Sequence, residues 1–79
     1  METTIIEYIR REFHGDKKNL VIQPEDDLLS SNLISSMDMI RLISFLEETF
    51  EHKIPPQDMT IDNFITVAAM RDYLQAAKA

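Results

Sequence analysis

Cysteine and tryptophan are absent from this 79-residue sequence, and glycine occurs once. Without cysteine the chain has neither a disulfide nor a thiolate metal ligand. The scarcity of glycine and the lack of tryptophan argue against a sheet-rich fold with many tight turns. The rest of the composition, 44% hydrophobic and 28% charged, is ordinary for a globular protein. We therefore expect residues 1–79 to form one small all-α domain.

Basic residues are also few. Eight lysines and arginines stand against fourteen aspartates and glutamates, which gives a formal net charge of −6. Nucleic acids and anionic membrane surfaces bind basic patches, so we expect neither as a partner, and the charge favours partners with basic docking surfaces. Charged residues interrupt every apolar run near the N-terminus before it reaches the length of a signal peptide or a membrane span. The expectation is a cytoplasmic monomer.

No group of residues has the spacing of an active site or a metal centre. His14 and His52 lie in different segments at predicted helix ends, where a histidine is typically solvated. Neighbouring carboxylates such as Glu47 and Glu48 face apart on a helix and cannot act as a catalytic pair. Residues 26–38 lack the central glycine and the alternating oxygen ligands of a calcium loop. We expect a protein that catalyses no reaction.

The N-terminal part of the chain predicts one helix and a long loop. Thr4 with Glu7 forms a capping-box pattern, and Gly15 is the left-handed residue typical of a helix end, so a helix is predicted from Thr4 to His14. Its apolar stripe comprises Ile5, Ile6, Ile9 and Phe13, with Tyr8 at the edge. Residues 16–34 have little helical period. In this loop we expect Lys17, Lys18 and Asn19 to be solvated, Asp26 to Leu29 to form a short helical turn, and the core to receive Leu20, Ile22, Leu28, Leu29 and Leu33.

The C-terminal part predicts two further helices. His52 and Lys53 follow the preceding helix, where cations suit the negative end of its dipole, and Pro55 and Pro56 stop it. A short third helix is predicted within residues 58–64, starting near Asp58 or Thr60. Thr66 then caps a last helix. Its core face is predicted to comprise Val67, Met70, Leu74 and Ala77, with Tyr73 beside it.

The longest amphipathic segment starts at Ser35 and runs to Phe50. Ser35 and Asp38 have the spacing of a capping box, which places Ser36 in the first turn of the helix. The free amides and positive dipole end of a first turn tolerate a phosphate group on a nearby hydroxyl. The predicted core stripe of this helix comprises Ile40, Ile43, Leu46 and Phe50, widened by Leu42 and Phe45.

This segment resembles the modification motif and second helix of acyl and peptidyl carrier proteins. The likeness rests on Ile34-Ser35-Ser36-Met37-Asp38 and on the two stretches 40–43 and 46–50, and the proline-rich turn and the Thr66-Val67 helix start extend it over nearly the whole chain. In that family an Asp-Ser-Leu or Asp-Ser-Met core carries 4′-phosphopantetheine on its serine, which corresponds to Ser36. The resemblance also implies the fold: a small four-helix bundle, with three main helices, a short third helix and a long first loop.

The resemblance implies a substrate shuttle. A phosphopantetheinyl transferase would attach 4′-phosphopantetheine from coenzyme A to Ser36. An acyl- or aminoacyl-loading ligase (an adenylation enzyme) would then charge its thiol, and downstream acyl-processing enzymes would use the thioester. Asn32 stands where many family members have glycine, and it readily adopts a left-handed conformation. Ser35 replaces the family's usual aspartate, which leaves open which transferase accepts the chain and whether Ser35 is modified instead. The alignment of Met37 and the apolar stripe favours Ser36.

The face around the modified serine is the expected docking surface. Met37 and Met39 start the helix on either side of its core stripe, so at least one of them faces outward as an adaptable contact. Arg41 interrupts the acidic face usual in fatty-acid carrier proteins, which favours a stand-alone carrier of the nonribosomal peptide or polyketide type. The predicted docking residues are Ile34, Ser35, Met37, Met39, Arg41, Met59 and Ile61. The alternative is an unmodified helical interaction domain that binds a partner helix through Met37 and Met39.

Overall fold

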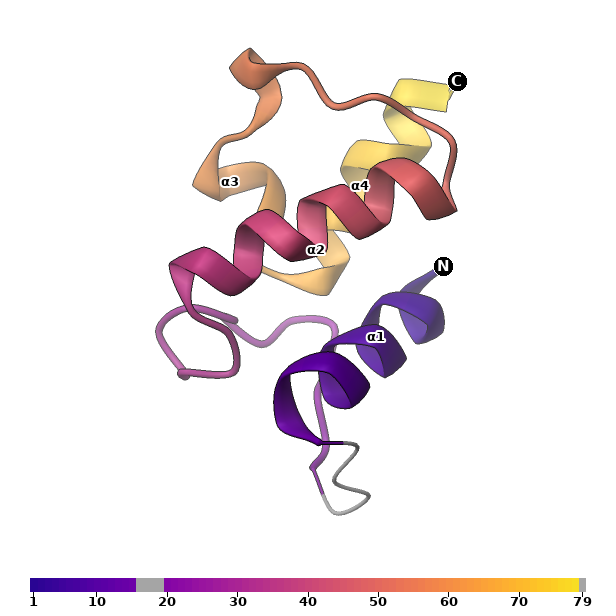
Figure 1. Cartoon of the computed structure of the whole chain (residues 1–79). Helices are drawn as coiled ribbons and strands as arrows, with labels where there is room; N and C mark the ends of the chain where they lie inside the picture. Colours follow the sequence, from indigo (N-terminus) through magenta and orange to yellow (C-terminus); the bar gives the residue numbers. More distant parts are fainter. Residues whose placement is uncertain (16–19, 79) are drawn as a thin grey trace.

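The computed structural model describes residues 1–15 and 20–78. Within them lie the helices α1 (Glu2–His14), α2 (Ser36–Thr49), α3 (Ile61–Phe64) and α4 (Val67–Lys78), a 3₁₀ turn η1 (Pro56–Asp58), and no strand. Figure 1 shows α2 crossing the molecule, with α1 along one side, α3 on the other and α4 behind; α4 packs on α1 and α3, and α1 packs on α2. The predicted all-α bundle with a short third helix and a long first loop is confirmed. None of these helices is both long and apolar enough to cross a membrane, over the residues described.

One apolar core joins all four helices and the first loop. No polar or charged side chain is buried among the described residues. The loop contributes three of the buried side chains, so hydrophobic burial anchors a long connection to the helices. Leu20, Leu29 and Leu33 pack against the core only partly buried. The buried residues are Ile5, Ile9, Ile22, Leu28, Ile34, Leu42, Ile43, Leu46, Ile54, Phe64, Val67, Met70 and Leu74.

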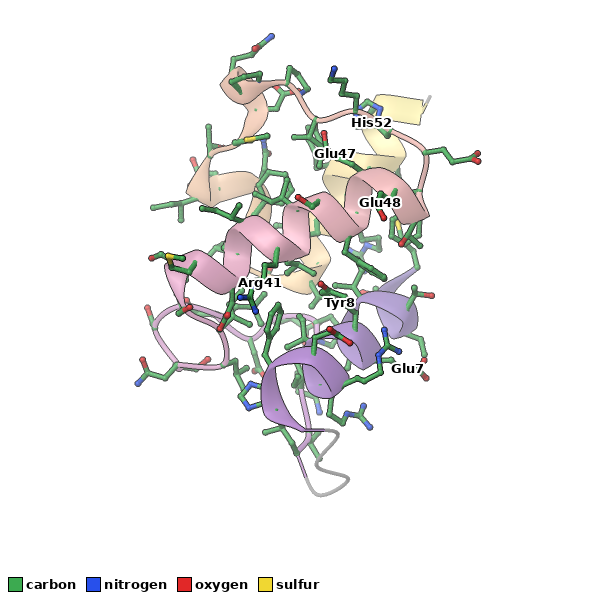
Figure 2. The ribbon with its side chains drawn as sticks, viewed as in Figure 1. Glu7, Tyr8, Arg41, Glu47, Glu48 and His52 are labelled. Carbon is green, nitrogen blue, oxygen red and sulfur yellow. The ribbon has the colours of Figure 1, made fainter. Side chains whose placement is uncertain are left out.

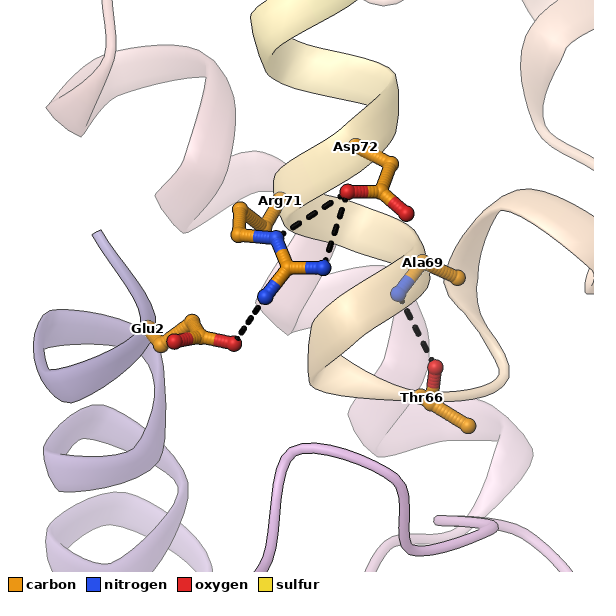
Figure 3. Close-up of polar contacts among 5 residues, drawn as sticks. All are labelled: Glu2, Thr66, Ala69, Arg71 and Asp72. Carbon is orange, nitrogen blue, oxygen red and sulfur yellow. Dashed lines mark hydrogen bonds and ion pairs between the residues drawn. The ribbon is translucent and has the colours of Figure 1, made fainter.

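Helix α1 starts two residues earlier than the sequence predicts. Met1 is its N-cap residue, no side chain caps it, and the Ile5 N–H donates to the Met1 carbonyl over 3.2 Å. The predicted capping box at Thr4 is therefore wrong, because Thr4 lies inside the helix. Glu2 instead suits the positive end of the dipole and pairs with Arg71 of α4 at 2.5 Å (Figure 3). Gly15 has φ 61°, as predicted for the helix end.

The described part of the first loop contains hydrogen-bonded turns and no helix. The helical turn predicted at Asp26–Leu29 is displaced, since the Ser31 N–H donates to the Asp27 carbonyl over 3.1 Å. The Asp27 carboxylate accepts the N–H groups of Ser30 (2.8 Å) and Leu29 (3.1 Å). The bond from the Ser30 amide lowers the pKa of this carboxyl. Asn32 has φ 60°, which confirms its predicted left-handed conformation. The prediction of solvated side chains at 17–19 lies outside the described residues.

The core face of α2 differs from the predicted stripe. Ile40 is 66% exposed, whereas Leu42, Ile43 and Leu46 are buried. Residues two apart on an α-helix differ by about 200° in direction, so Ile40 points away from the side on which Leu42 is buried. The stripe prediction was wrong at Ile40 because it took every apolar residue at helical spacing as part of the core.

The C-terminal half adds structure that the sequence pattern did not indicate. Residue Glu51 has φ 51°, η1 precedes α3, and α3 begins only at Ile61 after its N-cap residue Thr60. The predicted cap by Thr66 is confirmed, since the Ala69 N–H donates to its Oγ1 over 2.9 Å (Figure 3). Ala77 is exposed, so its predicted place on the core face is wrong, because α4 extends past the part of the bundle that covers it.

Candidate functional site

The start of α2 is fixed by a capping box. The Asp38 N–H donates to Ser35 Oγ over 3.1 Å, and the Ser35 N–H donates to Asp38 Oδ2 over 3.1 Å. Ser35 is the N-cap, with extended backbone angles (φ −90°, ψ 172°), so it lies just outside the helix. Both hydrogen bonds are local, which is why residue spacing alone predicted them.

Ser36 is the first residue of α2 and is exposed to solvent. Its hydroxyl makes no hydrogen bond to any described residue. The neighbouring Ser35 hydroxyl is also exposed but serves as the helix cap. A bulky group on Ser36 would therefore meet solvent and the positive end of the helix dipole, whereas one on Ser35 would disturb the cap.

The segment leading to Ser35 is held by three long-range or loop contacts. The Ile34 N–H donates to the Leu28 carbonyl over 3.1 Å, and the Leu28 N–H donates to the Ile65 carbonyl over 2.9 Å. From the other side, the imidazole Nε2 of His14 contacts the Leu33 carbonyl. His14 is partly buried, so the predicted solvated histidine is wrong. No sequence signal pairs His14 with Leu33, because the two residues lie 19 positions apart.

A small apolar cavity lies beside the start of α2, between α2 and α3. Its volume is about 90 Å³. Three of the predicted docking residues line it: Met39, which is partly buried, and Met59 and Ile61, which are 46% and 63% exposed. The remaining walls are Leu29, Ile43, Thr60, Phe64 and Ile65. Because its walls are almost wholly apolar, this cavity suits an apolar group rather than a charged one.

The other side of α2 bounds an open groove against α1, which the sequence analysis missed. The groove has a volume of about 380 Å³. On its floor the Tyr8 and Phe45 rings stack with centroids 3.8 Å apart. Figure 2 shows Tyr8 and Arg41 in the space between the two helices. Burial, and then the nearby Glu12 carboxylate, raise the pKa of Tyr8. The residues bounding the groove are Tyr8, Ile40, Arg41, Ser44, Phe45 and Glu48.

Most of the predicted docking residues are exposed to solvent or line the apolar cavity, and one of them, Ile34, lies in the core. Met37 is 72% exposed, and Ser35 and Arg41 are exposed as well. Arg41 has no ion-pair partner among the described residues. Ile34 is only 3% exposed, so it anchors the end of the loop and presents no side chain to a partner.

A cluster of polar side chains lies near the C-terminal end of α2, around Tyr73 of α4. The Tyr73 hydroxyl donates to Asp58 Oδ2 over 2.8 Å and lies 3.5 Å from His52 Nε2. Burial, together with the hydrogen bond to Asp58, raises the pKa of Tyr73 to about 12. His52 is partly buried and not solvated as predicted. Across the described part of the chain, no three His, Cys, Asp or Glu side chains are grouped to hold a metal ion. The hydrogen bond from Tyr73 to Asp58 joins α4 to the connection between α2 and α3.

Comparison with known proteins gives one informative match. No family model matches the chain. The chain is similar to a curated protein named acyl carrier protein from Syntrophobacter fumaroxidans (strain DSM 10017 / MPOB). The two are 32% identical over 79 residues, which is the whole of this chain and 93% of that protein. The similarity therefore includes the start of α2, the first loop and the C-terminal helices.

Proposed function

This chain belongs to the acyl carrier protein family, and from that premise we propose that Ser36 carries 4′-phosphopantetheine. Acyl carrier proteins are carriers and not catalysts, so this chain is a carrier protein that performs no chemistry of its own. In the proposal, a phosphopantetheinyl transferase binds coenzyme A and the carrier. The Ser36 oxygen loses its proton and bonds to the phosphorus that bears pantetheine, the pyrophosphate P–O bond of coenzyme A breaks, and 3′,5′-adenosine bisphosphate leaves. The terminal thiol of the attached group, the one thiol in a chain without cysteine, would then hold the substrate as a thioester.

One observation carries the assignment to Ser36: its hydroxyl is exposed and unbonded at the first position of α2, while its neighbour's hydroxyl is the cap. A modified Ser36 leaves both capping bonds intact. A modified Ser35 would disturb an interaction that typically contributes about 1 kcal/mol to helix stability. The geometry thus favours Ser36 over Ser35 for the attachment.

The docking face is proposed to surround that hydroxyl. Ser35, Met37 and Arg41 would contact partner enzymes from the end of the loop and from α2. Met59 and Ile61 would extend this face at the rim of the apolar cavity, with Met39 in its wall and Ile34 supporting it from the core. Methionine side chains adapt to several partner surfaces, as successive partners of one carrier would require.

The pathway is proposed to be of the nonribosomal peptide or polyketide type, acting in the cytoplasm with residues 1–79 as one carrier domain. Arg41 supports this subtype, because it places an unpaired cation in the middle of the face that would meet partners. The partners would be an acyl- or aminoacyl-loading ligase and downstream acyl-processing enzymes.

The cavity of about 90 Å³ is smaller than the roughly 150 Å³ cavity that admits benzene in another protein, so it would shelter only a few apolar atoms of the cargo.

The test is covalent loading followed by intact-mass measurement. The protein is incubated with coenzyme A and a broad-specificity phosphopantetheinyl transferase, as wild type, Ser36→Ala, Ser35→Ala and Ser35→Thr. The wild type and Ser35→Thr, which keeps a capping oxygen, are expected to gain one phosphopantetheine, and Ser36→Ala to gain none. Modification that persists in Ser36→Ala and disappears in Ser35→Ala would move the site to Ser35.

A second candidate is an unmodified helical interaction domain with the same fold. The exposed apolar side chains of Met37 (72%) and Ile40 (66%) on α2 support it, since such side chains commonly mark contact surfaces. The loading assay separates the two functions. A wild-type protein that remains unmodified with several transferases, while its circular dichroism shows it folded, would favour the interaction domain.

A further inference from the structure

The side chain of His14 links the end of α1 to the loop just before the α2 cap. Its Nε2 contacts the Leu33 carbonyl, two residues before Ser35. A carbonyl oxygen only accepts hydrogen bonds, so the imidazole Nε2–H is the donor in this contact. Gly15, left-handed with φ 61°, ends the helix directly after His14, and its N–H closes α1 on the Arg10 carbonyl. The histidine is thus held at a helix end, where its ring reaches the loop.

Among the described residues, no other hydrogen bond joins α1 to residues 29–36. The remaining bonds of that stretch are internal to the loop and the cap. Asn32 N–H donates to the Leu29 carbonyl over 3.2 Å, and Ile34 N–H donates to the Leu28 carbonyl over 3.1 Å. These bonds fix the shape of the turn. The His14 contact fixes where that turn lies relative to α1.

We propose that His14 is a positioning residue for Ser36. By donating to Leu33 it holds the last turn of the loop, so that α2 begins at one place and presents the Ser36 hydroxyl to a modifying enzyme in one orientation. This inference rests on the proposed modification of Ser36. Leu33 lies three residues before Ser36, a span of at most about 10 Å of extended chain. A displacement of the Leu33 carbonyl would therefore also shift the Ser36 hydroxyl.

A matched set of variants tests the donor itself. His14→Gln keeps an N–H donor at the position of Nε2, His14→Asn keeps one that is too short to reach, and His14→Leu has none. His52→Leu removes the other partly buried histidine, at the opposite end of α2, and serves as the control. Circular dichroism first establishes that each variant is folded.

Amide hydrogen exchange tests the contact without any modifying enzyme. In His14→Leu and His14→Asn, exchange at the Ile34 and Asp38 amides is expected to accelerate about fivefold, the ratio that corresponds to one ordinary hydrogen bond. His14→Gln and His52→Leu should leave these amides at the wild-type rate. The Leu74 amide in α4 reports global opening, and its exchange should stay at the wild-type rate while exchange at Ile34 accelerates. Equal acceleration at all three amides would assign His14 a general stabilising role and overturn the proposal.

The kinetics of phosphopantetheine loading test whether the His14 contact affects how Ser36 is presented to the transferase. His14→Leu and His14→Asn are expected to raise the KM of the transferase for the carrier by up to about fivefold with little change in kcat, since fewer molecules present the serine correctly. His14→Gln should restore the wild-type KM. Failure of glutamine to restore it, or wild-type kinetics in His14→Leu, would overturn the proposal. A wild-type protein that is never modified would instead refute the proposed function, and the exchange data would still decide whether the contact holds the loop.

Discussion

The start of α2 is exposed and carries its own capping box, whereas the connection after its last turn is hydrogen-bonded both back to α2 and across to α4. The Glu47 carboxylate accepts the Ile54 N–H over 2.8 Å, and the connection that follows is fastened to α4 through Tyr73 and Asp58. The two ends are visible at opposite sides of Arg41 in Figure 2, where Glu47 and His52 mark the far end. We call the start of α2 the exposed end, because the Ser36 hydroxyl meets solvent there. We call the connection after its last turn the braced end, because these hydrogen bonds fix it to α2 and α4. In the proposed function, partner enzymes would act at the start of α2 while the rest of the fold stays unchanged.

The largest expected effect comes from breaking the braced end. Ile54→Ala removes a side chain that is 2% exposed and should lower the free energy of unfolding by about 2–5 kcal/mol, through lost burial and the cavity left behind. Val21→Ala, at a position 69% exposed, should change it by less than about 0.5 kcal/mol. Chemical denaturation of both variants measures the difference. Equal effects would mean that Ile54 is not part of the core.

The next effect comes from the Tyr73 hydroxyl. Tyr73→Phe removes its hydrogen bond to the Asp58 carboxylate and should cost about 1–2 kcal/mol of unfolding free energy. Tyr8→Phe is the matched control, because the Tyr8 hydroxyl makes no hydrogen bond to any described residue and its ring stacking on Phe45 is retained. Denaturation curves that coincide for the two variants would contradict a brace at this end.

The pKa of Tyr73 gives this contact a pH signature. Its folded-state pKa is raised to about 12, above the ordinary value of 10.0 for tyrosine, so its contribution is complete below pH 10. That contribution should be lost as the pH rises from about 10 towards 12, as the native state resists forming the phenolate. The stability difference between wild type and Tyr73→Phe, measured by denaturation at several pH values, should shrink over this window. A difference that grows there would have the wrong sign.

At the exposed end the effect of a single change is smaller. Ser35→Ala should lower stability by about 1 kcal/mol because the Asp38 amide loses its capping oxygen. Ser35→Thr keeps an oxygen and should retain most of that stability. Thermal unfolding followed by circular dichroism measures both. A threonine variant as unstable as the alanine variant would show that the capping oxygen is not what holds this end.

The smallest effect on stability is expected at Arg41. Arg41→Glu alters an exposed residue without an ion-pair partner among those described, so it should change the free energy of unfolding by less than about 0.5 kcal/mol. It should nevertheless slow loading by the ligase that charges the carrier, since it reverses the charge of the proposed docking face. Unchanged loading would remove Arg41 from that face.

The same contrast explains what could be predicted from the sequence. The start of α2 and the Thr66 cap depend on residues within a few positions, and their spacing was sufficient. The left-handed Asn32 was predicted from the family resemblance and from the conformational preference of asparagine. The contact of His14 with Leu33 and the cluster around Tyr73 join residues brought together only by folding, so no local pattern indicated them. Ile40 was misplaced for a related reason: which side of α2 is buried depends on where α1 and α4 pack.

The most direct test of the account is to locate the attached group on the wild-type protein. After incubation with coenzyme A and a phosphopantetheinyl transferase, fragment-ion mass spectrometry distinguishes Ser35 from Ser36 in the peptide that contains both. The account predicts one phosphopantetheine, on Ser36. A group found on Ser35, or a folded protein that accepts none from any transferase tried, would contradict it.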